Sequence, residues 1–232
     1  MPKDTPALLA GHHLFRDLDT AVVERIAALA VTRRLEAGEV LFLKRDEGDA
    51  LYCVLKGQVR ISTTGPSGRA VILTMMGPGD IFGEIALLDG MPRTADATTI
   101  APTELITIPR RDFMALLERE PSLSIHLLKL LCERVRRTSE QVEDSTLLPV
   151  PGRLAKRLLS MAEHDGEVTS DGVRVRLLPS QHELGQMLGI SRVSINQHLQ
   201  RWRKNGWISL GRGHVIICDR EALQALVDAG AD

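Results

Sequence analysis

The sequence SQHELGQMLGISRVSINQHLQRW, residues 180–202, decides the fold of the C-terminal part of the chain. Ser180, followed three residues later by Glu183, forms a capping box that predicts the start of a helix. Gly189 suits the left-handed turn that ends this helix, so that a second helix begins at Arg192. One face of the second helix is apolar and consists of Ile195, Leu199 and Trp202. The stretch therefore predicts two helices joined by a tight turn.

The residues that follow predict a β-hairpin. Residues 207–217, WISLGRGHVII, are two β-prone runs around a Gly-Arg-Gly tip. Together these elements predict a winged helix-turn-helix, in which an arginine and amides on the exposed helix face reach guanine and adenine edges. The arginine at the hairpin tip would contact phosphate. The residues expected to contact DNA are Ser180, Gln181, Ser191, Arg192, Val193, Ser194, Asn196, Gln197 and Arg212.

The distribution of charge agrees with a polyanionic partner. The net charge of the chain is −1, but residues 150–217 carry 10 Lys+Arg and 5 Asp+Glu, whereas the segments on either side each carry −3. A local basic excess of this kind is compatible with nucleic acid, although a solvated helix surface has a similar composition. The alternative is a helical hairpin and a β-hairpin that bind protein, and the cap, the glycine turn, the basic excess and the wing together favour DNA.

Length and composition set the broad class of protein. The chain has 232 residues, of which 44% are hydrophobic and 25% charged, as in globular domains. We expect no membrane segment and no secretory signal, since no apolar run is long enough and none follows the N-terminus. The cysteines Cys53, Cys132 and Cys218 are odd in number and far apart, which argues against a disulfide framework or a metal site. These features predict a protein of the reducing cytoplasm with no metal.

The N-terminal half changes from helical to β-prone texture near Gly38. Residues 1–36 contain short helical patterns, and residues 38–109 contain short β-prone runs separated by glycine turns. The runs are residues 40–43, 51–55, 59–61, 71–73 and 105–108. Several short strands at this spacing predict a closed or folded-over antiparallel sheet.

A long helix is predicted after Pro121, because neither glycine nor proline interrupts residues 122–148. Alternating three- and four-residue steps on this helix join Leu128, Leu131, Val135, Thr138 and Val142. This pattern is typical of the seam of a parallel dimer, flanked here by Arg134, Arg136, Arg137, Glu140 and Glu143. The alternative is a helix that packs onto its own domain. Residues 149–152, Pro-Val-Pro-Gly, then predict a hinge.

A candidate anion site lies in the sequence FGEIALL, residues 82–88, followed by PRTA, residues 92–95. Gly83 allows backbone amides to approach a ligand, and a short helix beginning there directs its N-terminus at an anion. Arg93 offers the fork that suits a phosphodiester, Thr94 adds a hydroxyl donor, and Glu84 can accept from a sugar hydroxyl. Taken singly, a glycine turn and a Glu–Arg pair are ordinary structural features.

These motifs resemble those of the bacterial cyclic AMP receptor protein and fumarate–nitrate regulator (CRP/FNR) family, over essentially the whole chain. The resemblance implies that Gly83 and Glu84 hold the ribose and that Arg93 and Thr94 bind the cyclic phosphate. Ile85, Ala86 and Ala95 belong to the same binding motifs. Thr138 and Ser139 match the hydroxyl pair that contacts the purine at the dimer seam, and their alternative is a polar notch in a coiled coil.

The resemblance also implies an architecture and a function. We expect an α+β protein with a β-roll (jelly-roll) domain at residues 1–120, a central dimerisation helix at 121–148 and a winged helix-turn-helix domain at 149–232. It would be a homodimeric transcription regulator, not an enzyme, that binds 3′,5′-cyclic AMP and palindromic DNA and contacts RNA polymerase. Cyclic GMP stays open as the ligand. The rival hypotheses are a regulatory subunit of an enzyme and a constitutive DNA-binding regulator with a vestigial pocket.

Departures from the family pattern sharpen these expectations. Val193 stands where close relatives of the cyclic AMP receptor have Glu, and Gln197 stands where they have a second Arg. Since Arg192 is kept, we expect half-sites that retain an outer TGT-like triplet of the family's TGTGA, with a relaxed base preference at the fourth position. The two half-sites should lie about one helical turn apart. The chain lacks the clustered N-terminal cysteines of oxygen-sensing relatives. His12 and His13 leave a haem-based sensor open, with ordinary surface histidines as the simpler interpretation.

Overall fold

The structure is a computed structural model that describes residues 18–66, 68–176 and 180–229. It divides into two compact units, Met1–Val135 and Arg136–Asp232, and the division falls inside helix α5 (Pro121–Leu147). Both units mix helices and strands, so the α+β class is confirmed. His12 and His13 lie outside the described residues. In the described part of the chain, no helix combines the length and the apolar character needed to cross a bilayer.

The first unit contains two antiparallel four-stranded sheets, as the sequence predicts. One has the order β1-β8-β3-β6, with β1 at Val31–Leu35, β8 at Thr103–Pro109, β3 at Ala50–Lys56 and β6 at Ile81–Phe82. The other has the order β2-β7-β4-β5, with β2 at Val40–Phe42, β7 at Asp96–Thr99, β4 at Val59–Thr64 and β5 at Ala70–Met76. Folding these two sheets over a common core produces the β-roll.

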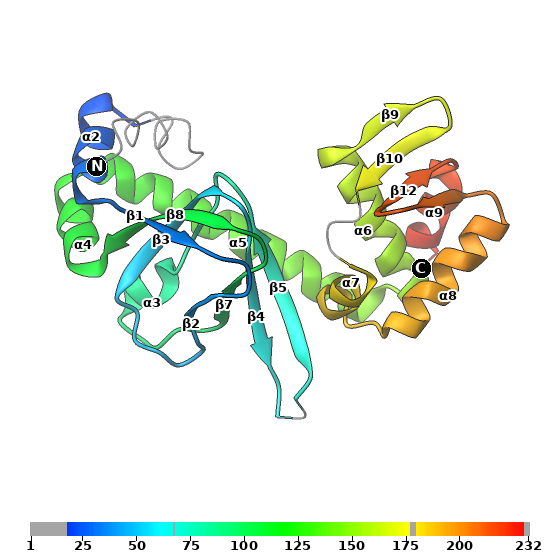
Figure 1. Ribbon diagram of the computed structural model, residues 1–232, viewed down its shortest axis with the longest axis horizontal. Helices are drawn as coiled ribbons and strands as arrows, with labels where there is room; N and C mark the ends of the chain where they lie inside the picture. Colours follow the sequence, from blue (N-terminus) through cyan, green and yellow to red (C-terminus); the bar gives the residue numbers. More distant parts are fainter. Residues whose placement is uncertain (1–17, 67, 177–179, 230–232) are drawn as a thin grey trace. The chain divides into compact units, whose positions relative to one another are not determined.

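Strand β3 connects the two cores of the first unit, because its side chains alternate between the two faces of the sheet. Ala50, Tyr52 and Val54 pack into the core shared with strands of the second sheet. Leu51 and Cys53 face a second core, which includes side chains from α2 (Thr20–Leu29), α4 (Arg110–Arg119) and the start of α5. In Figure 1, α2 and α4 lie together at one end of the roll. Burial on both faces explains why residues 50–55 of this strand are an uninterrupted apolar run.

Three strands of this unit were not predicted. Strand β1 lies in the segment expected to be helical, and of its residues VTRRL only Leu35 is buried, as at the edge of a sheet. An edge strand of this kind has too few apolar residues to produce a strong alternating pattern. Strand β7, DATT, is polar, and β6 has only two residues. All three strands form because they pair with neighbouring strands, and such pairing cannot be read from a local sequence pattern.

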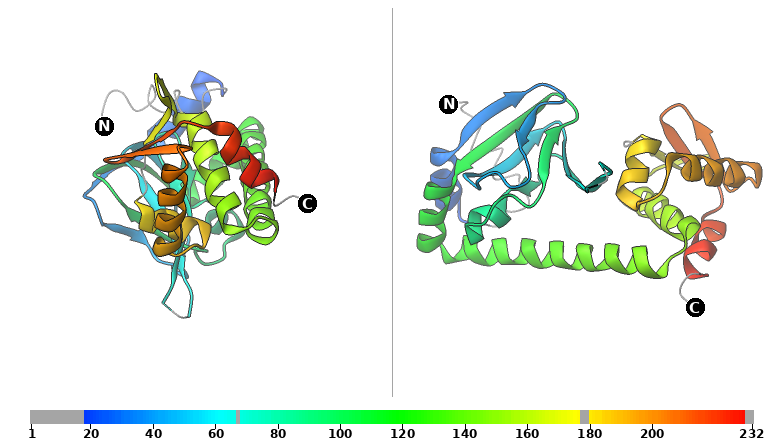
Figure 2. Two further views of the ribbon diagram at one scale, coloured as in Figure 1. Left: turned by 90° about the vertical axis from the view of Figure 1, so that its right-hand side faces the viewer. Right: turned by 90° about the horizontal axis from the view of Figure 1, so that it is seen from below.

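The second unit contains helices and a four-stranded antiparallel sheet with the order β11-β12-β10-β9. Figure 2 gives two further views, in which these elements run from yellow-green to red. Its helices are α6 (Val150–Asp165), α7 (Gln181–Leu188), α8 (Arg192–Lys204) and α9 (Arg220–Asp228). Its strands are β9 (Glu167–Thr169), β10 (Gly172–Arg176), β11 (Ile208–Gly211) and β12 (His214–Ile217). One core joins all four helices to strands β10, β11 and β12.

The predicted helix-turn-helix and wing are present in this unit. Ser180 caps α7 with a complete capping box, and Gly189 ends α7 with a left-handed φ of 67°. The apolar face of α8 is buried and consists of Ile195, Leu199 and Trp202. Strands β11 and β12 form the wing.

Two features of the second unit differ from the prediction. Hairpin β9–β10 was not predicted, and it extends the sheet of the wing. The predicted hinge is also shorter than expected, because Val150, Pro151 and Gly152 belong to the first turn of α6 and only Pro149 precedes it. Proline is tolerated there because the first amides of a helix have no intrahelical partner.

Candidate functional site

A tight turn in the first unit brings several predicted site residues together. Gly83 lies between β6 and α3 (Glu84–Asp89) with φ 86° and ψ 2°, a left-handed conformation that favours glycine. A Cβ atom at this position would lie 2.7 Å from Nη1 of Arg93 and 3.1 Å from the carbonyl oxygen of Ala50. Any side chain here would therefore displace the arginine that contacts the turn.

The side chain of Arg93 is buried, and the residue is only 3% exposed. Its Nη1 donates to the carbonyl of Gly83 at 2.8 Å, and its Nη2 donates to the carbonyl of Ala50 at 2.9 Å and to Oδ1 of Asp49 at 3.1 Å. The Nε of Arg93 is buried and has no hydrogen-bond partner in the structure. Arg93 therefore keeps one donor that the described protein groups do not satisfy.

Aromatic rings and a backbone loop hold Arg93 in place. Its guanidinium carbon lies 4.3 Å from the centre of the Phe42 ring and 5.5 Å from that of Tyr52, within the range of cation–π contacts. The backbone amide of Arg93 donates to Asp46 at 2.8 Å, and its carbonyl accepts from Arg45 at 2.9 Å. Burial, followed by the charge of Asp49, raises the pKa of Tyr52, so its ring stays neutral beside the arginine.

Glu84 is the second buried charged residue of the turn, with 1% of its surface exposed. Its Oε1 accepts from Nη1 of Arg134 on α5, and Nη2 of the same arginine donates to the carbonyl of Ile81. The other carboxylate oxygen, Oε2, is buried without a hydrogen-bond partner. Buried polar atoms are almost always paired, so Oε2 of Glu84 and Nε of Arg93 are candidate groups for binding a polar ligand.

The remaining predicted nucleotide residues differ in exposure. Ala86 and Ala95 are buried, and Ile85 and Thr94 are exposed. Thr138 and Ser139 are exposed on the part of α5 that belongs to the second unit. The structure therefore unites Gly83, Glu84 and Arg93 around one turn, while the roles of the others stay predictions.

The predicted seam of α5 is largely uncovered. Leu128 is 56% exposed, Val135 65% and Val142 59%, and Leu131 is half-buried. Only Leu123 and Leu127 of this helix are buried. A helix that packed its whole apolar stripe onto its own domain would bury these side chains, so most of the stripe is available to another surface.

The candidate DNA face of α8 is exposed and, apart from Val193, polar. Arg192, Val193, Asn196 and Gln197 are exposed, and Ser191 accepts from the amide of Ser194 at 3.1 Å as the helix cap. On the same helix, the centres of the His198 and Trp202 rings lie 6.2 Å apart. Burial, followed by the charge of Arg201, lowers the pKa of His198. Arg212 is exposed at the tip of the wing. This arrangement leaves the predicted DNA-contacting residues of α8 accessible to a groove.

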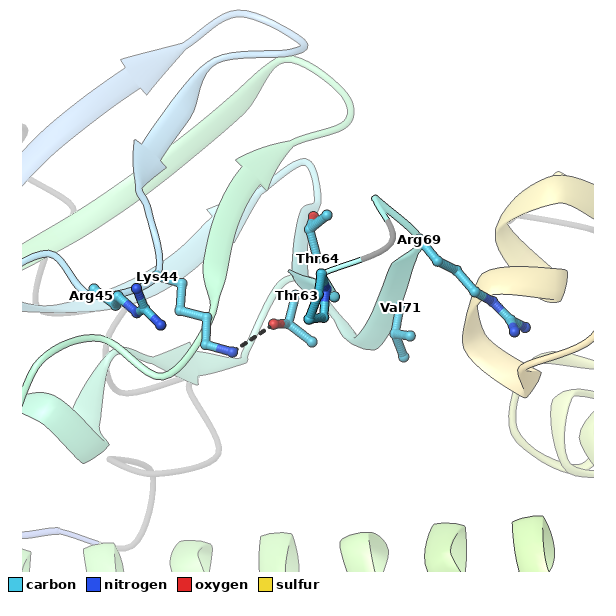
Figure 3. Close-up of a pocket in the computed structure, with 8 residues that line it drawn as sticks. Lys44, Arg45, Thr63, Thr64, Arg69 and Val71 are labelled. Atoms are coloured by element: carbon cyan, nitrogen blue, oxygen red, sulfur yellow. Dashed lines mark hydrogen bonds between the residues drawn. The ribbon is translucent and has the colours of Figure 1, made fainter.

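An open basic hollow of about 730 Å³ lies elsewhere in the first unit (Figure 3). Lys44, Arg45 and Arg69 contribute its charge, and Nζ of Lys44 donates to Oγ1 of Thr63 at 3.0 Å. None of the predicted nucleotide-binding residues lines it. Within the described ranges, no cluster of three or more His, Cys, Asp or Glu could hold a metal ion.

Sequence reasoning missed the groups that hold the two buried charges. Phe42, Asp49 and Tyr52 come from strands and a loop distant in sequence from Arg93, and no local signal links them. Arg134 was interpreted as a charged flank of the dimer seam, but its contacts to Glu84 and Ile81 make it part of the turn. The presence of a glutamate in a predicted anion site was the one signal in the sequence that could have prompted a search for a counter-charge.

Models of known protein families match residues in both units. A model of the cyclic nucleotide-binding domain matches residues 32–120, and a model of the Crp-like helix-turn-helix domain matches residues 152–226. A CRP-like cAMP-activated global transcriptional regulator of Mycobacterium tuberculosis is 36% identical over 206 residues, which cover 87% of this chain and 92% of that protein. The cyclic AMP receptor protein of Thermus thermophilus is 29% identical over 218 residues, 94% of this chain and 98% of that protein.

Solved structures share the fold. The c-di-GMP responsive global regulator CLP of Xanthomonas campestris superposes with a TM-score of 0.76 at 23% identity, covering 86% of this chain and 99% of that one. A CooA mutant of Carboxydothermus hydrogenoformans superposes with a TM-score of 0.77 at 18% identity, covering 91% of each chain. At these identities the likeness concerns the fold alone.

Proposed function

Because this chain belongs to the CRP/FNR family of transcription regulators, we propose that it is a homodimer that binds 3′,5′-cyclic AMP and then a palindromic promoter site. Membership of the family makes it a cyclic-nucleotide-responsive transcription regulator and not an enzyme. The choice of cyclic AMP, the dimer, the palindrome and RNA polymerase as a partner are the parts that we propose.

The pair of unsatisfied buried atoms around Gly83 is the observation that carries the nucleotide site. Oε2 of Glu84 can only accept and Nε of Arg93 can only donate, and both are buried without a partner. A cyclic nucleotide carries a ribose hydroxyl for the first and an anionic phosphate for the second. The residues present therefore fit the group: Glu84 would hold the ribose and Arg93 the phosphate, with Thr94 exposed beside them.

The exposed stripe of α5 supports the dimer. Its exposed members Leu128, Val135 and Val142 are spaced at seven residues, which matches one position of a coiled-coil heptad. In such a seam we propose that Thr138 and Ser139 meet the purine. Since hydroxyls both donate and accept, cyclic GMP is the second candidate ligand, with its carbonyl and amino groups replacing the amino group of adenine.

The exposed face of α8 supports the DNA-binding role. Arg192 can bond both acceptors of a guanine, while Asn196 and Gln197 present the amides that suit adenine. Two copies related by two-fold symmetry would place their recognition helices about one helical turn apart, which requires a palindrome. We propose that Arg212 adds a phosphate contact at each half-site, and that a regulator bound there contacts RNA polymerase.

Calorimetric titration of the purified full-length protein with cyclic AMP and with cyclic GMP tests the ligand. We expect saturable binding of both at one site per chain, with tighter binding of cyclic AMP. The Glu84→Gln variant, which replaces the buried acceptor by an amide, should weaken both. Tighter binding of cyclic GMP would overturn the choice of cyclic AMP, and the absence of binding by either nucleotide would overturn the nucleotide site itself.

A further inference from the structure

We infer that Phe42 is a positioning residue of the proposed nucleotide site, whose ring sets the orientation of the Arg93 guanidinium toward a bound phosphate. The inference rests on the proposed function, because it assigns a role to a residue beside the same ligand. Phe42 ends strand β2 and lies outside both sequence motifs that predict the site.

An irregularity in the edge strand β2 turns Phe42 toward the interior. Val40 pairs with Thr98 and Phe42 with Ala97, so β2 has one more residue than β7 between these two pairs. In a regular strand, Val40 and Phe42 would face the same side of the sheet, whereas an extra residue of this kind redirects the next side chain. Accordingly, Val40 is 54% exposed, and Phe42 packs against the core shared by the two sheets.

Two aromatic rings from the other sheet hold the Phe42 ring in place. Its centre lies 5.6 Å from the centre of the Tyr52 ring on β3 and 6.2 Å from that of the Phe82 ring on β6. The rings of Tyr52 and Phe82 stack on each other, with centres 5.2 Å apart and an angle of 14° between their planes. Close packing of this kind leaves the Phe42 ring little freedom to move away from its neighbours.

The guanidinium of Arg93 depends on a contact to its face, because its hydrogen bonds to the protein all leave from its two terminal nitrogens. These bonds go to the carbonyls of Gly83 and Ala50 and to Asp49. A planar group held only through its terminal nitrogens can still tilt about the line that joins them. The guanidinium carbon lies over the Phe42 ring, 4.3 Å from its centre, so the ring restricts this tilt and fixes the direction of the unsatisfied Nε donor.

The aromatic support is on one side of the guanidinium. The guanidinium carbon of Arg93 lies 4.3 Å from the centre of the Phe42 ring and 5.5 Å from that of Tyr52, and the two centres are only 5.6 Å apart. Rings that enclosed the guanidinium between them would be separated by nearly the sum of the first two distances. The two rings therefore support Arg93 from one side and do not obstruct a phosphate on the other.

Calorimetric titration of the full-length protein with cyclic AMP tests the role of the ring. Phe42→Leu keeps an apolar side chain and removes the ring, so we expect affinity to fall about 3- to 30-fold, the range of cation–π contacts. Phe42→Tyr keeps the ring, and Phe42 is half-buried, so this variant should bind within about twofold of the wild type.

A double-mutant cycle shows whether Phe42 acts through Arg93. Arg93→Gln removes the cation, so no guanidinium remains for the ring to orient. In this background, Phe42→Leu should lower affinity by less than about a further twofold. A residue with a merely structural role would lower affinity equally in both backgrounds. If Arg93→Gln binds cyclic AMP too weakly to titrate, the contrast between Phe42→Leu and Phe42→Tyr decides.

Phe113→Leu is the matched control. Phe113 is fully buried in the other core of the first unit, so its substitution should lower the melting temperature and leave cyclic AMP affinity at the wild-type value. Thermal unfolding also shows whether the Phe42 variants are folded. If Phe42→Leu is not, Phe42→Met, whose flexible side chain fills more of the space, is titrated in its place.

Wild-type affinity in a folded Phe42→Leu variant would overturn the inference, as would an equal loss in Phe42→Tyr or in Phe113→Leu, or a loss that Arg93→Gln does not diminish. A wild-type protein that binds no cyclic nucleotide would overturn the proposed function, and that outcome is distinct because it is seen before any substitution is made.

Discussion

The proposed nucleotide site of the first unit is buried, whereas the proposed DNA face of the second unit is exposed. Glu84 and Arg93 are at most 3% exposed and depend on partners from β3, the loop before it and α5. Arg192, Val193, Asn196 and Gln197 are exposed, and the helix that carries them is anchored by its apolar face and by the Ser191 cap. The geometry of the buried site therefore depends on the residues that surround it, whereas the chemistry of the exposed face depends on the side chains that α8 itself presents.

This difference predicts how substitutions behave in each region. A change in the buried site should alter binding and stability together, because the side chains that bond to the protein are also the ones proposed to bind the ligand. A change on the exposed face alters DNA recognition with little effect on folding, because surface substitutions seldom change stability by more than about 0.5 kcal/mol.

The largest expected effect belongs to Arg93→Ala. Removing one partner of a buried charged pair costs about 3–5 kcal/mol, so cyclic-nucleotide affinity should fall by two or more orders of magnitude. The carbonyls of Gly83 and Ala50 would also lose their donor, so we expect a lower melting temperature as well. Calorimetric titration and thermal unfolding measure the two effects.

Arg110→Ala is the control for Arg93→Ala. Nε of Arg110 donates at 2.8 Å to the carbonyl of Leu87, so this arginine also bonds to the backbone of α3, away from the turn. Its loss should lower stability and leave nucleotide affinity near the wild-type value. Near wild-type affinity in Arg93→Ala itself would show that Arg93 does not bind the ligand.

Alkaline pH should destabilise the protein through the buried thiol of Cys53. Burial raises the pKa of Cys53 from 9.0 to about 12, so the unfolded chain loses this proton before the folded chain does. The stability that the neutral thiol provides is therefore complete below pH 9 and declines between about pH 9 and 12. The slope for one group is about 1.4 kcal/mol per pH unit. Urea unfolding at several pH values, followed by circular dichroism, measures it.

Cys53→Ala should remove this contribution to the slope, whereas Cys132→Ser should keep it because Cys132 is exposed. The second unit provides an internal comparison, since both tryptophans, Trp202 and Trp207, lie in it and report its unfolding. Equal slopes in the wild type and Cys53→Ala would contradict the assignment.

A smaller effect is expected at the exposed face, in the bases that α8 selects. Val193 is 67% exposed at the second position of α8 and can offer only an apolar contact, for instance to a thymine methyl. Val193→Glu adds an acceptor for the amino group of cytosine, so it should favour a G·C pair at the fourth position by about 1–3 kcal/mol. Stability should hardly change. Selection from a random duplex pool compares the two proteins, and a strict G at the fourth position with the wild type would refute the argument.

The smallest effect is expected at Thr138. A hydroxyl contact to the base is worth about 0.5–1.5 kcal/mol, so Thr138→Ala should change the ratio of cyclic AMP to cyclic GMP affinity more than the overall affinity. Thr146→Ala, which removes a hydroxyl bonded to Val142 on the same helix, should leave the ratio unchanged. Equal losses for both nucleotides in Thr138→Ala would indicate a structural role.

How far the sequence predicts the structure also differs between the two regions. In the second unit, the Ser180 cap, the Gly189 turn and the apolar face of α8 are local patterns, and the structure confirms all three. In the first unit, the motifs around Gly83 and Arg93 identify the turn, but the partners of Arg93 and Glu84 depend on strand pairing and on α5. Edge strand β1 and polar strand β7 were missed for the same reason, since contacts distant in sequence stabilise them.

The dependence of DNA affinity on cyclic AMP tests the central claim most directly. The wild-type protein is titrated onto a palindromic duplex with TGT-like half-sites, at fixed salt, without nucleotide and with saturating cyclic AMP. We predict that cyclic AMP tightens specific DNA binding at least tenfold and that Arg93→Ala removes the difference. Tight binding that does not respond to cyclic AMP would support a constitutive regulator, and nucleotide binding without specific DNA retention would support a regulatory subunit of an enzyme; either result would contradict the account.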